Sequence, residues 1–253
     1  VVALATGAIQ VDWLSNIVTA VALVAAIYLW AQMYTSKLVT REEKNRLLGF
    51  IPMFISGVLF FGIFQQQFTV MTIYSDVRLD RHMFGWEIPP SLVQSINPIF
   101  IVIFSAVFAT MWTKLGDRQW STPVKFGVAN IVIGISLFFF LPFSGAEANS
   151  TPMFVIVFIL FLFTMAELLL SPVGNALATK VAPVAFPSRM MAVWMMAVAM
   201  GTSLAGSLAS FYNPDDAGAE NTFFISLGVV SIVLGAILLV LSRWVVKKFS
   251  TFR

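Results

Sequence analysis

The chain has 253 residues, of which 59% are hydrophobic and only 11% are charged, and its mean hydropathy is +0.90. Soluble domains usually carry about 25% charged residues, so this composition argues against a soluble globular domain and indicates a membrane protein. With no cysteine, one histidine and a net charge of +3, the sequence predicts no disulfide, no thiolate or histidine metal site, no cofactor and no nucleic acid partner.

Seven apolar segments are each long enough to cross a bilayer as a helix, which takes about 20 residues. Polar or turn-rich stretches separate these segments, which span residues 13–36, 47–74, 89–113, 122–143, 152–179, 188–212 and 222–246. The alternating pattern of outer-membrane strands is not visible. We therefore predict an all-α, multi-pass membrane protein. No signal peptide is expected, and an initial Val in place of Met indicates a piece of a longer protein.

The distribution of Lys and Arg predicts the orientation of the spans, because short loops rich in these residues stay in the cytoplasm. With the N-terminus outside, only Arg78 and Arg81 of the 15 basic residues fall on the outer side. The C-terminus is then cytoplasmic, and the expected location is the cell membrane (inner or plasma membrane). Of the 12 acidic residues, all but Glu167 fall in loops or at the ends of spans.

The second and third spans contain side-chain amides. The second span reads "FGIFQQQFTV", with Gln65, Gln66 and Gln67 in succession. Three neighbours fan over about 200° of a helix, so we expect at least one of them to face a cavity. In the third span, Gln94 and Asn97 lie three residues apart and can face one cavity. Hydrogen bonding between helices is the alternative explanation for these amides.

The fifth span contains "FTMAELLLSPVG", in which Glu167 is the only charged residue placed deep in a span. A charge at mid-bilayer costs roughly 2.5–3.5 kcal/mol on insertion scales, so such a residue normally faces a cavity or has a partner. Ser171 lies about one turn further along the same helix face. Burial raises the pKa of a carboxyl group, and a cationic partner lowers it. A carboxyl group that gains and loses such a partner can therefore bind and release a proton. The alternative is a protonated Glu167 that a neighbouring helix satisfies.

A proline and a glycine follow this acid. Pro172 cannot donate a hydrogen bond to the carbonyl of Leu168, and Gly174 leaves room for a second backbone or a substrate. Interrupted helices at membrane depth recur in transporters, where they can act as hinges, so we predict a hinge at Pro172 and Gly174. In the sixth span, Trp194 lies among methionines and small residues, which fits either close helix packing or an adaptable pocket wall.

The chain contains, in order, "EEKNRLLGFIPMFISGVLFFGIFQQQ", "QSINPIFIVIFSAVFATMW", "LFTMAELLLSPVGNALATKVAP" and "RMMAVWMMAVAMGTSLAG". Together these stretches resemble the proton-dependent oligopeptide transporter (POT/PTR) family of the major facilitator superfamily, from about residue 41 to residue 246. The resemblance implies that residues 41–253 form the C-terminal six-helix transport bundle. It implies that residues 1–40 hold an extra transmembrane helix and a loop that link the two bundles, and that the N-terminal bundle is a partner absent from this sequence.

The resemblance also implies a function, which is proton-coupled import of di- and tripeptides by alternating access. This chain would be the C-terminal half of a monomeric transporter embedded in the lipid bilayer, with peptides and protons as its ligands. Carried over by position, Glu167 looks like the acid that binds the peptide amino terminus, assisted by Ser171. Asn97 resembles the asparagine that hydrogen-bonds the peptide backbone.

Three further positions take their expected roles from the same resemblance. Trp194 resembles the tryptophan of a side-chain pocket, and Gln66 is expected to border the same cavity. Gln65 occupies a position where many relatives carry Glu or Asp implicated in proton coupling. Because this chain has an amide there, the resemblance leaves proton coupling through that position in doubt. Cationic partners for Glu167 are expected on the absent bundle.

Other functions fit the sequence less well. A related carrier of nitrate, amino acids or drugs is the main alternative. A seven-helix receptor matches the span count and the orientation, but no Lys lies deep in the last span to hold retinal and no Cys pair ties outer loops. An enzyme is not expected, and no catalytic residue is assigned. One loop His and one deep acid form neither an aspartyl dyad nor a Ser–His pair.

Overall fold

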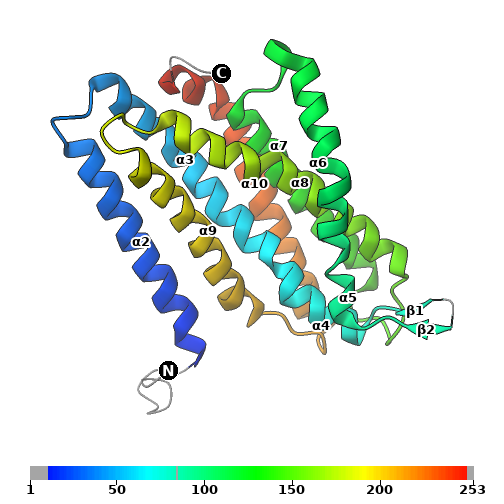
Figure 1. The fold of residues 1–253 in the computed structure, drawn as a ribbon. Helices are drawn as coiled ribbons and strands as arrows, with labels where there is room; N and C mark the ends of the chain where they lie inside the picture. The colour runs from blue at the N-terminus through cyan, green and yellow to red at the C-terminus, as the bar shows by residue number, and fades with distance from the viewer. Residues whose placement is uncertain (1–10, 84, 250–253) are drawn as a thin grey trace.

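The computed structural model describes residues 11–83 and 85–249. Its helices in chain order are α2 (Val11–Thr35), α3 (Arg41–Phe64), α4 (Val70–Val77), α5 (Pro90–Val93), α6 (Ile96–Leu115), α7 (Thr122–Leu137), α8 (Met153–Val181), α9 (Pro187–Ala209) and α10 (Ala217–Phe249) (Figure 1). Three 3-10 helices, η1 (Gln65–Phe68), η2 (Gly116–Arg118) and η3 (Phe138–Phe143), and an antiparallel hairpin of β1 (His82–Met83) and β2 (Trp86–Glu87) complete the described elements.

All seven predicted spans correspond to helices that are long and apolar enough to cross a membrane. The second span differs most from its prediction, because α3, η1 and α4 continue one another over residues 41–77. Its early start has a local cause in a capping box. The hydroxyl oxygen of Thr40 accepts a hydrogen bond from the backbone N–H of Glu43 at 3.3 Å, and the Glu43 carboxylate accepts from the N–H of Thr40 at 2.8 Å.

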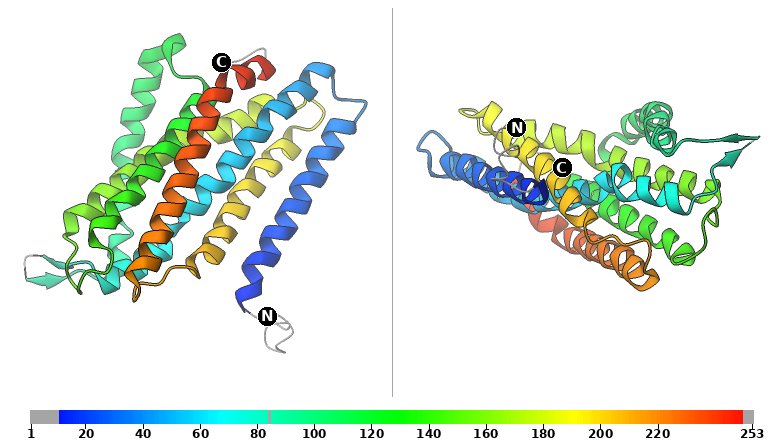
Figure 2. Two further views of the ribbon diagram at one scale, coloured as in Figure 1. Left: turned by 180° about the vertical axis from the view of Figure 1, so that it is seen from behind. Right: turned by 90° about the horizontal axis from the view of Figure 1, so that it is seen from below.

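The helices form one bundle around α3, which contacts α7, α8, α9 and α10. The two edges of the bundle are α2, which packs chiefly on α9, and α6, which packs chiefly on α8. Figure 2 shows α2 and α6 on opposite sides of the bundle. Only 11% of the α2 span and 11% of the α6 span are buried, against 61% of the span that contains α3. Both edge helices therefore present most of their surface to lipid or to another protein segment.

Small residues set the closest helix contacts. An added Cβ at Gly134 would lie 2.7 Å from the carbonyl oxygen of Gly228, and one at Gly235 would lie 2.6 Å from that of Gly127. These four glycines bring the backbones of α7 and α10 together. Membrane helices associate through such close van der Waals contacts because lipid is as apolar as the helix surfaces, so the hydrophobic effect does not drive the helices together.

Close packing also explains part of the small-residue run in α9. An added Cβ at Gly201 would lie 2.5 Å from the Cβ of Phe61 and 2.7 Å from the carbonyl oxygen of Val58. Gly201 is therefore where α9 approaches α3, as the packing interpretation of this run predicted.

Candidate functional site

Glu167 and Ser171 share one face of α8, one turn apart, and both are partly buried. The Oε2 atom of Glu167 and the Oγ atom of Ser171 are buried and have no hydrogen-bond partner among the described residues. A buried polar atom left unpaired costs about 1–3 kcal/mol, and more for a charged group. This turn of α8 therefore presents an acceptor and a hydroxyl whose hydrogen bonds the described chain does not supply.

Asn97 brings α6 to the same site. It lies in the first turn of α6, is 3% exposed, and donates a hydrogen bond from Nδ2 to the Thr164 hydroxyl at 3.0 Å. The Asn97 side chain also lies next to the Glu167 carboxylate. The structure thus places Asn97 beside Glu167, although 70 positions of sequence separate them. The neighbouring-helix alternative does not account for Oε2 of Glu167, which stays unpaired among the described residues.

Trp194 lies on the other side of α8, inside the bundle. It is 1% exposed, and its ring packs against the rings of Phe50, Phe61 and Phe126 at centroid distances of 5.9–6.2 Å. Its Nε1 atom donates to the side-chain oxygen of Asn175 at 2.8 Å. The ring fills the core between α3, α7, α8 and α9, and a direct contact with substrate stays a prediction.

Gly174 makes room for that ring. An added Cβ at Gly174 would lie 2.1 Å from Cζ2 of Trp194, which is far inside van der Waals contact. The group that approaches this glycine is therefore a tryptophan side chain of the same bundle. The sequence had predicted a second backbone or a substrate.

Gly174→Ala should destabilise the protein by about 1–3 kcal/mol or more, because the methyl group forces Trp194 or α8 to move. The expected result is a lower melting temperature of the purified protein. Gly62→Ala is the matched control, since its added Cβ would meet nothing closer than the Gly201 carbonyl oxygen at 3.6 Å. Equal melting temperatures for the two variants would contradict the assigned contact.

The helix that carries the site is not interrupted. α8 runs as one helix from Met153 to Val181, with Pro172 inside it. The expected interruption is therefore absent from this backbone. Proline is tolerated within membrane helices when neighbouring segments hold the helix in place. Here Leu170 before Pro172 and Leu177 after it are buried. The hinge at Pro172 and Gly174 stays a prediction.

The three glutamines lie in η1, where α3 gives way to a 3-10 turn. Gln65 donates to the Thr202 hydroxyl at 3.0 Å, and Gln66 donates to the carbonyl oxygens of Gly62 and Ala205 at 3.1 and 3.2 Å. Hydrogen bonding to α9 therefore accounts for these two amides, which are not hydrogen-bonded to Glu167 in the described structure.

Gln67 differs from its two neighbours. It is 1% exposed, and both atoms of its amide group lack a hydrogen-bond partner within residues 11–83 and 85–249. The sequence identified the three glutamines as a group but did not single out Gln67.

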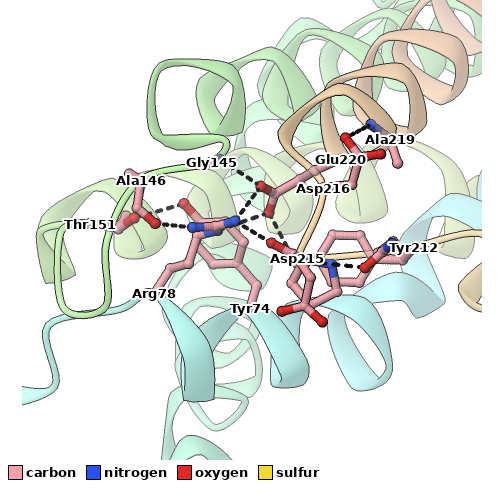
Figure 3. Close-up of polar contacts among 12 residues, drawn as sticks. Tyr74, Arg78, Gly145, Ala146, Thr151, Tyr212, Asp215, Asp216, Ala219 and Glu220 are labelled. Atoms are coloured by element: carbon pink, nitrogen blue, oxygen red, sulfur yellow. Dashed lines mark hydrogen bonds and ion pairs between the residues drawn. The ribbon is translucent and has the colours of Figure 1, made fainter.

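A second charged cluster lies at the end of the bundle that the sequence places outside, and it is shown in Figure 3. Arg78 follows α4, and Glu220 lies in the first turn of α10. Arg78 Nη2 is 2.9 Å from Oε2 of Glu220, and Arg78 Nε donates to Oε1 at 3.2 Å. The two side chains are 5% and 0% exposed, so this is a buried, bidentate ion pair.

Loops complete the hydrogen bonds of this pair. The Tyr212 hydroxyl donates to Oε1 of Glu220 at 2.8 Å, and the N–H of Gly145 donates to Oε2 at 3.0 Å. The Arg78 guanidinium also donates to the carbonyl oxygens of Ala146 and Pro214. Burial raises the pKa of the Tyr212 hydroxyl, and so does its hydrogen bond to Glu220, which keeps it protonated as a donor. The cluster joins the end of α4 to the loops before α8 and α10.

The sequence did not predict this ion pair, because both residues were assigned to outer loops. One signal pointed to it, since Arg78 is one of only two basic residues on the side where basic residues are rare.

A family model and the relatives found by comparison with known proteins point to the same family. The PTR2 model of the POT family matches residues 4–237. The "Uncharacterized transporter YclF" of Bacillus subtilis (strain 168) is 36% identical over 96% of this chain and 49% of its own length. The "Di-/tripeptide transporter" of Lactococcus lactis subsp. cremoris is 35% identical over 94% of this chain and 48% of its own.

A solved structure gives the same result for the fold. The crystal structure of a POT family transporter in complex with 5-aminolevulinic acid is 34% identical, with a TM-score of 0.86 over 96% of this chain and 50% of that one. The chain spans about half the length of the relatives it matches. This similarity confirms the predicted fold class, an all-α six-helix bundle of the major facilitator fold preceded by one extra transmembrane helix. The chain belongs to the POT family.

Proposed function

We propose that this chain is the C-terminal half of a proton-coupled importer of di- and tripeptides that works by alternating access. Residues 41–253 are the transport bundle, and residues 1–40 hold the linker helix and loop. Family membership, seven spanning helices and a match to about half of each relative support this proposal. The N-terminal six-helix bundle is its partner, and the whole transporter works as a monomer.

The amine site is the observation that carries the proposal. Oε2 of Glu167 and Oγ of Ser171 lie one turn apart with unmet hydrogen bonds, and Asn97 lies beside them. A peptide ammonium group has three N–H donors, so it can donate to both oxygens at once. Its bond to the carboxylate is charge-assisted and gains strength in a partly dry site. In this arrangement Asn97 orients Glu167 and offers its amide to the peptide backbone.

The remaining residues take supporting parts in this proposal. Trp194 packs behind α8 through Gly174 and Asn175 and forms the wall of a side-chain pocket. Gln66 borders the cavity from η1. Glu167 exchanges a proton, the peptide amine and a cation of the N-terminal bundle. The Gln65 amide does not titrate, so Gln65 cannot bind and release a proton together with Glu167. The acids or bases that couple protons through Glu167 therefore lie on the N-terminal half.

The orientation completes the proposal. We place the N-terminus of this piece outside and its C-terminus in the cytoplasm. The reason is that Lys and Arg are concentrated in the loops and helix ends on the membrane side where α10 ends. The amine site then lies in the middle of the fifth span, between the two membrane surfaces. A binding site at that depth can open to either side as the two halves move.

Competition for uptake tests the substrate class. The full-length protein in liposomes should take up a labelled dipeptide when an inward proton gradient is imposed. Unlabelled di- and tripeptides should compete, whereas nitrate, free amino acids and amine-free drugs should not. 5-Aminolevulinic acid, the ligand of one relative, should compete where α-amino acids do not, because its amine and carboxylate lie further apart. Competition by nitrate or single amino acids, without competition by tripeptides, would favour the alternative carrier.

A further inference from the structure

A second pocket lies between α6, α7 and α8, near the ends of these helices that the sequence places in the cytoplasm. Its volume is about 390 Å³. Neither Glu167 nor Ser171 lines it, although the residues that follow them, Leu168 and Pro172, do. The pocket therefore borders the amine site along α8 without including its two polar groups. Two tryptophans line it, Trp112 of α6 and Trp120, which precedes α7. Two basic residues, Lys125 of α7 and Lys180 of α8, also line it.

The two lysines leave positive charge in this pocket without an acid to balance it. Lys125 is only 6% exposed, its Nζ atom lies 3.9 Å from the centre of the Trp112 ring, and it donates to Gln119 Oε1 at 2.7 Å. No carboxylate of the described residues lies within ion-pair distance of Lys125 or Lys180. Lys180 is exposed and lines the same pocket. Since the buried charge of Lys125 has no acid to pair with, an anion is expected in this pocket.

Further donors belong to residues that line the same pocket. Nε1 of Trp112 is buried and has no hydrogen-bond partner in the described part of the chain. Thr122, the first residue of α7, also lines the pocket, and a helix N-terminus offers backbone N–H groups to an anion. The buried lysine, the unpaired indole N–H and the helix terminus are three kinds of donor suited to phosphate oxygens.

The remaining walls of the pocket are apolar. Leu168, Val173 and Leu177 of α8 and Phe108 of α6 line it below the lysines, toward the middle of the membrane. Tryptophans such as Trp112 and Trp120 are typical of the level of lipid headgroups. α6 is an edge helix with only 11% of its span buried, so the pocket lies at the margin of the bundle. Basic side chains above an apolar wall fit a molecule with an anionic head and a hydrocarbon tail.

We propose that this pocket binds an anionic phospholipid of the cytoplasmic leaflet. Its phosphate lies between Lys125 and Lys180, and an acyl chain follows the apolar wall formed by Leu168, Val173 and Leu177. Basic pockets between transmembrane helices on the cytoplasmic side suit such headgroups. The choice of leaflet rests on the proposed orientation, whereas the lipid chemistry does not depend on it or on transport.

Native mass spectrometry of the full-length protein in detergent tests this site directly. Phosphatidylglycerol should bind more tightly than phosphatidylcholine. Lys125→Gln and Lys180→Gln should each weaken phosphatidylglycerol binding about fivefold, since each basic residue contributes to attraction of an anionic lipid. Lys114→Gln is the matched control. Lys114 lies in the last turn of α6, at the same membrane side as the pocket, but it does not line the pocket.

Three outcomes would overturn the proposal. The first is equal phosphatidylglycerol binding by wild type and Lys180→Gln; this exposed residue can be replaced without disturbing the core. The second is an equal loss in the Lys114→Gln control, which would indicate general surface charge. The third is displacement of the lipid by millimolar inorganic phosphate, which would assign the pocket to a free anion. Lys125→Arg should keep the binding and thereby separate loss of charge from misfolding.

Discussion

Glu167→Gln is expected to abolish proton-driven uptake of a labelled dipeptide by the full-length transporter in liposomes. Glutamine keeps the size of the side chain, but it cannot become a carboxylate. The peptide amine then loses its charge-assisted acceptor. Removing one partner of a buried charge pair costs about 2–5 kcal/mol, or roughly 30-fold to several thousand-fold in affinity. The proton loses its binding group in the same change.

Two controls accompany this prediction. Glu147→Gln removes the same charge from an exposed acid in the loop before α8 and should leave uptake unchanged. Ser171→Ala removes one neutral hydrogen bond of the amine, so it should weaken peptide binding by about 0.5–1.5 kcal/mol, or twofold to thirteenfold. Wild-type uptake by Glu167→Gln under an imposed proton gradient would show that the assigned role is wrong.

Glu220→Gln should cause the largest loss of stability. Arg78 is 5% exposed beside it, so the variant leaves a buried guanidinium without its countercharge. Breaking a buried ion pair by removing one partner costs about 3–5 kcal/mol. The expected result is a markedly lower melting temperature of the purified protein. Because the pair also holds the loops before α8 and α10, protease cleavage in residues 144–152 and 210–216 should rise.

The chain offers a matched control for this pair. Arg81 and Glu87 are also 2.9 Å apart and lie nearby in the sequence, but the Glu87 side chain is 54% exposed. Replacing Glu87 with Gln should cost no more than about 0–1 kcal/mol, since solvent screens this pair. Replacing Arg78 and Glu220 together with Met should recover part of the loss. Equal shifts for Glu220→Gln and Glu87→Gln would contradict the account of a buried clamp.

The spans were predictable, and the candidate site could be proposed, because both depend on local properties of the chain. A run of about 20 apolar residues has few options other than a membrane helix. A single acid in such a run is conspicuous, and Glu167 could be identified without a structure. The start of α3 at Arg41 also has a local signal, since Thr40 and Glu43 form a capping box.

What could not be predicted depends on contacts between distant segments. Arg78 and Glu220 are 142 positions apart, and each looks like a loop or helix-end charge until the fold buries both. The contact between Gly174 and Trp194 leaves no local pattern in the sequence, because 20 positions and a helix connection separate the two residues. The continuous course of α8 through Pro172 likewise depends on neighbouring helices that hold it on both sides.

Binding of a dipeptide with a free or an acetylated amino terminus tests the central claim most directly. Calorimetry on the purified full-length protein needs no proton gradient and isolates the amine contact. Wild type should bind the free dipeptide at least about tenfold more tightly than the acetylated one, because only the ammonium group pairs with Glu167. In Glu167→Gln this preference should disappear. A variant that still prefers the free amino terminus by the wild-type factor would contradict the assignment of Glu167 to the peptide amine.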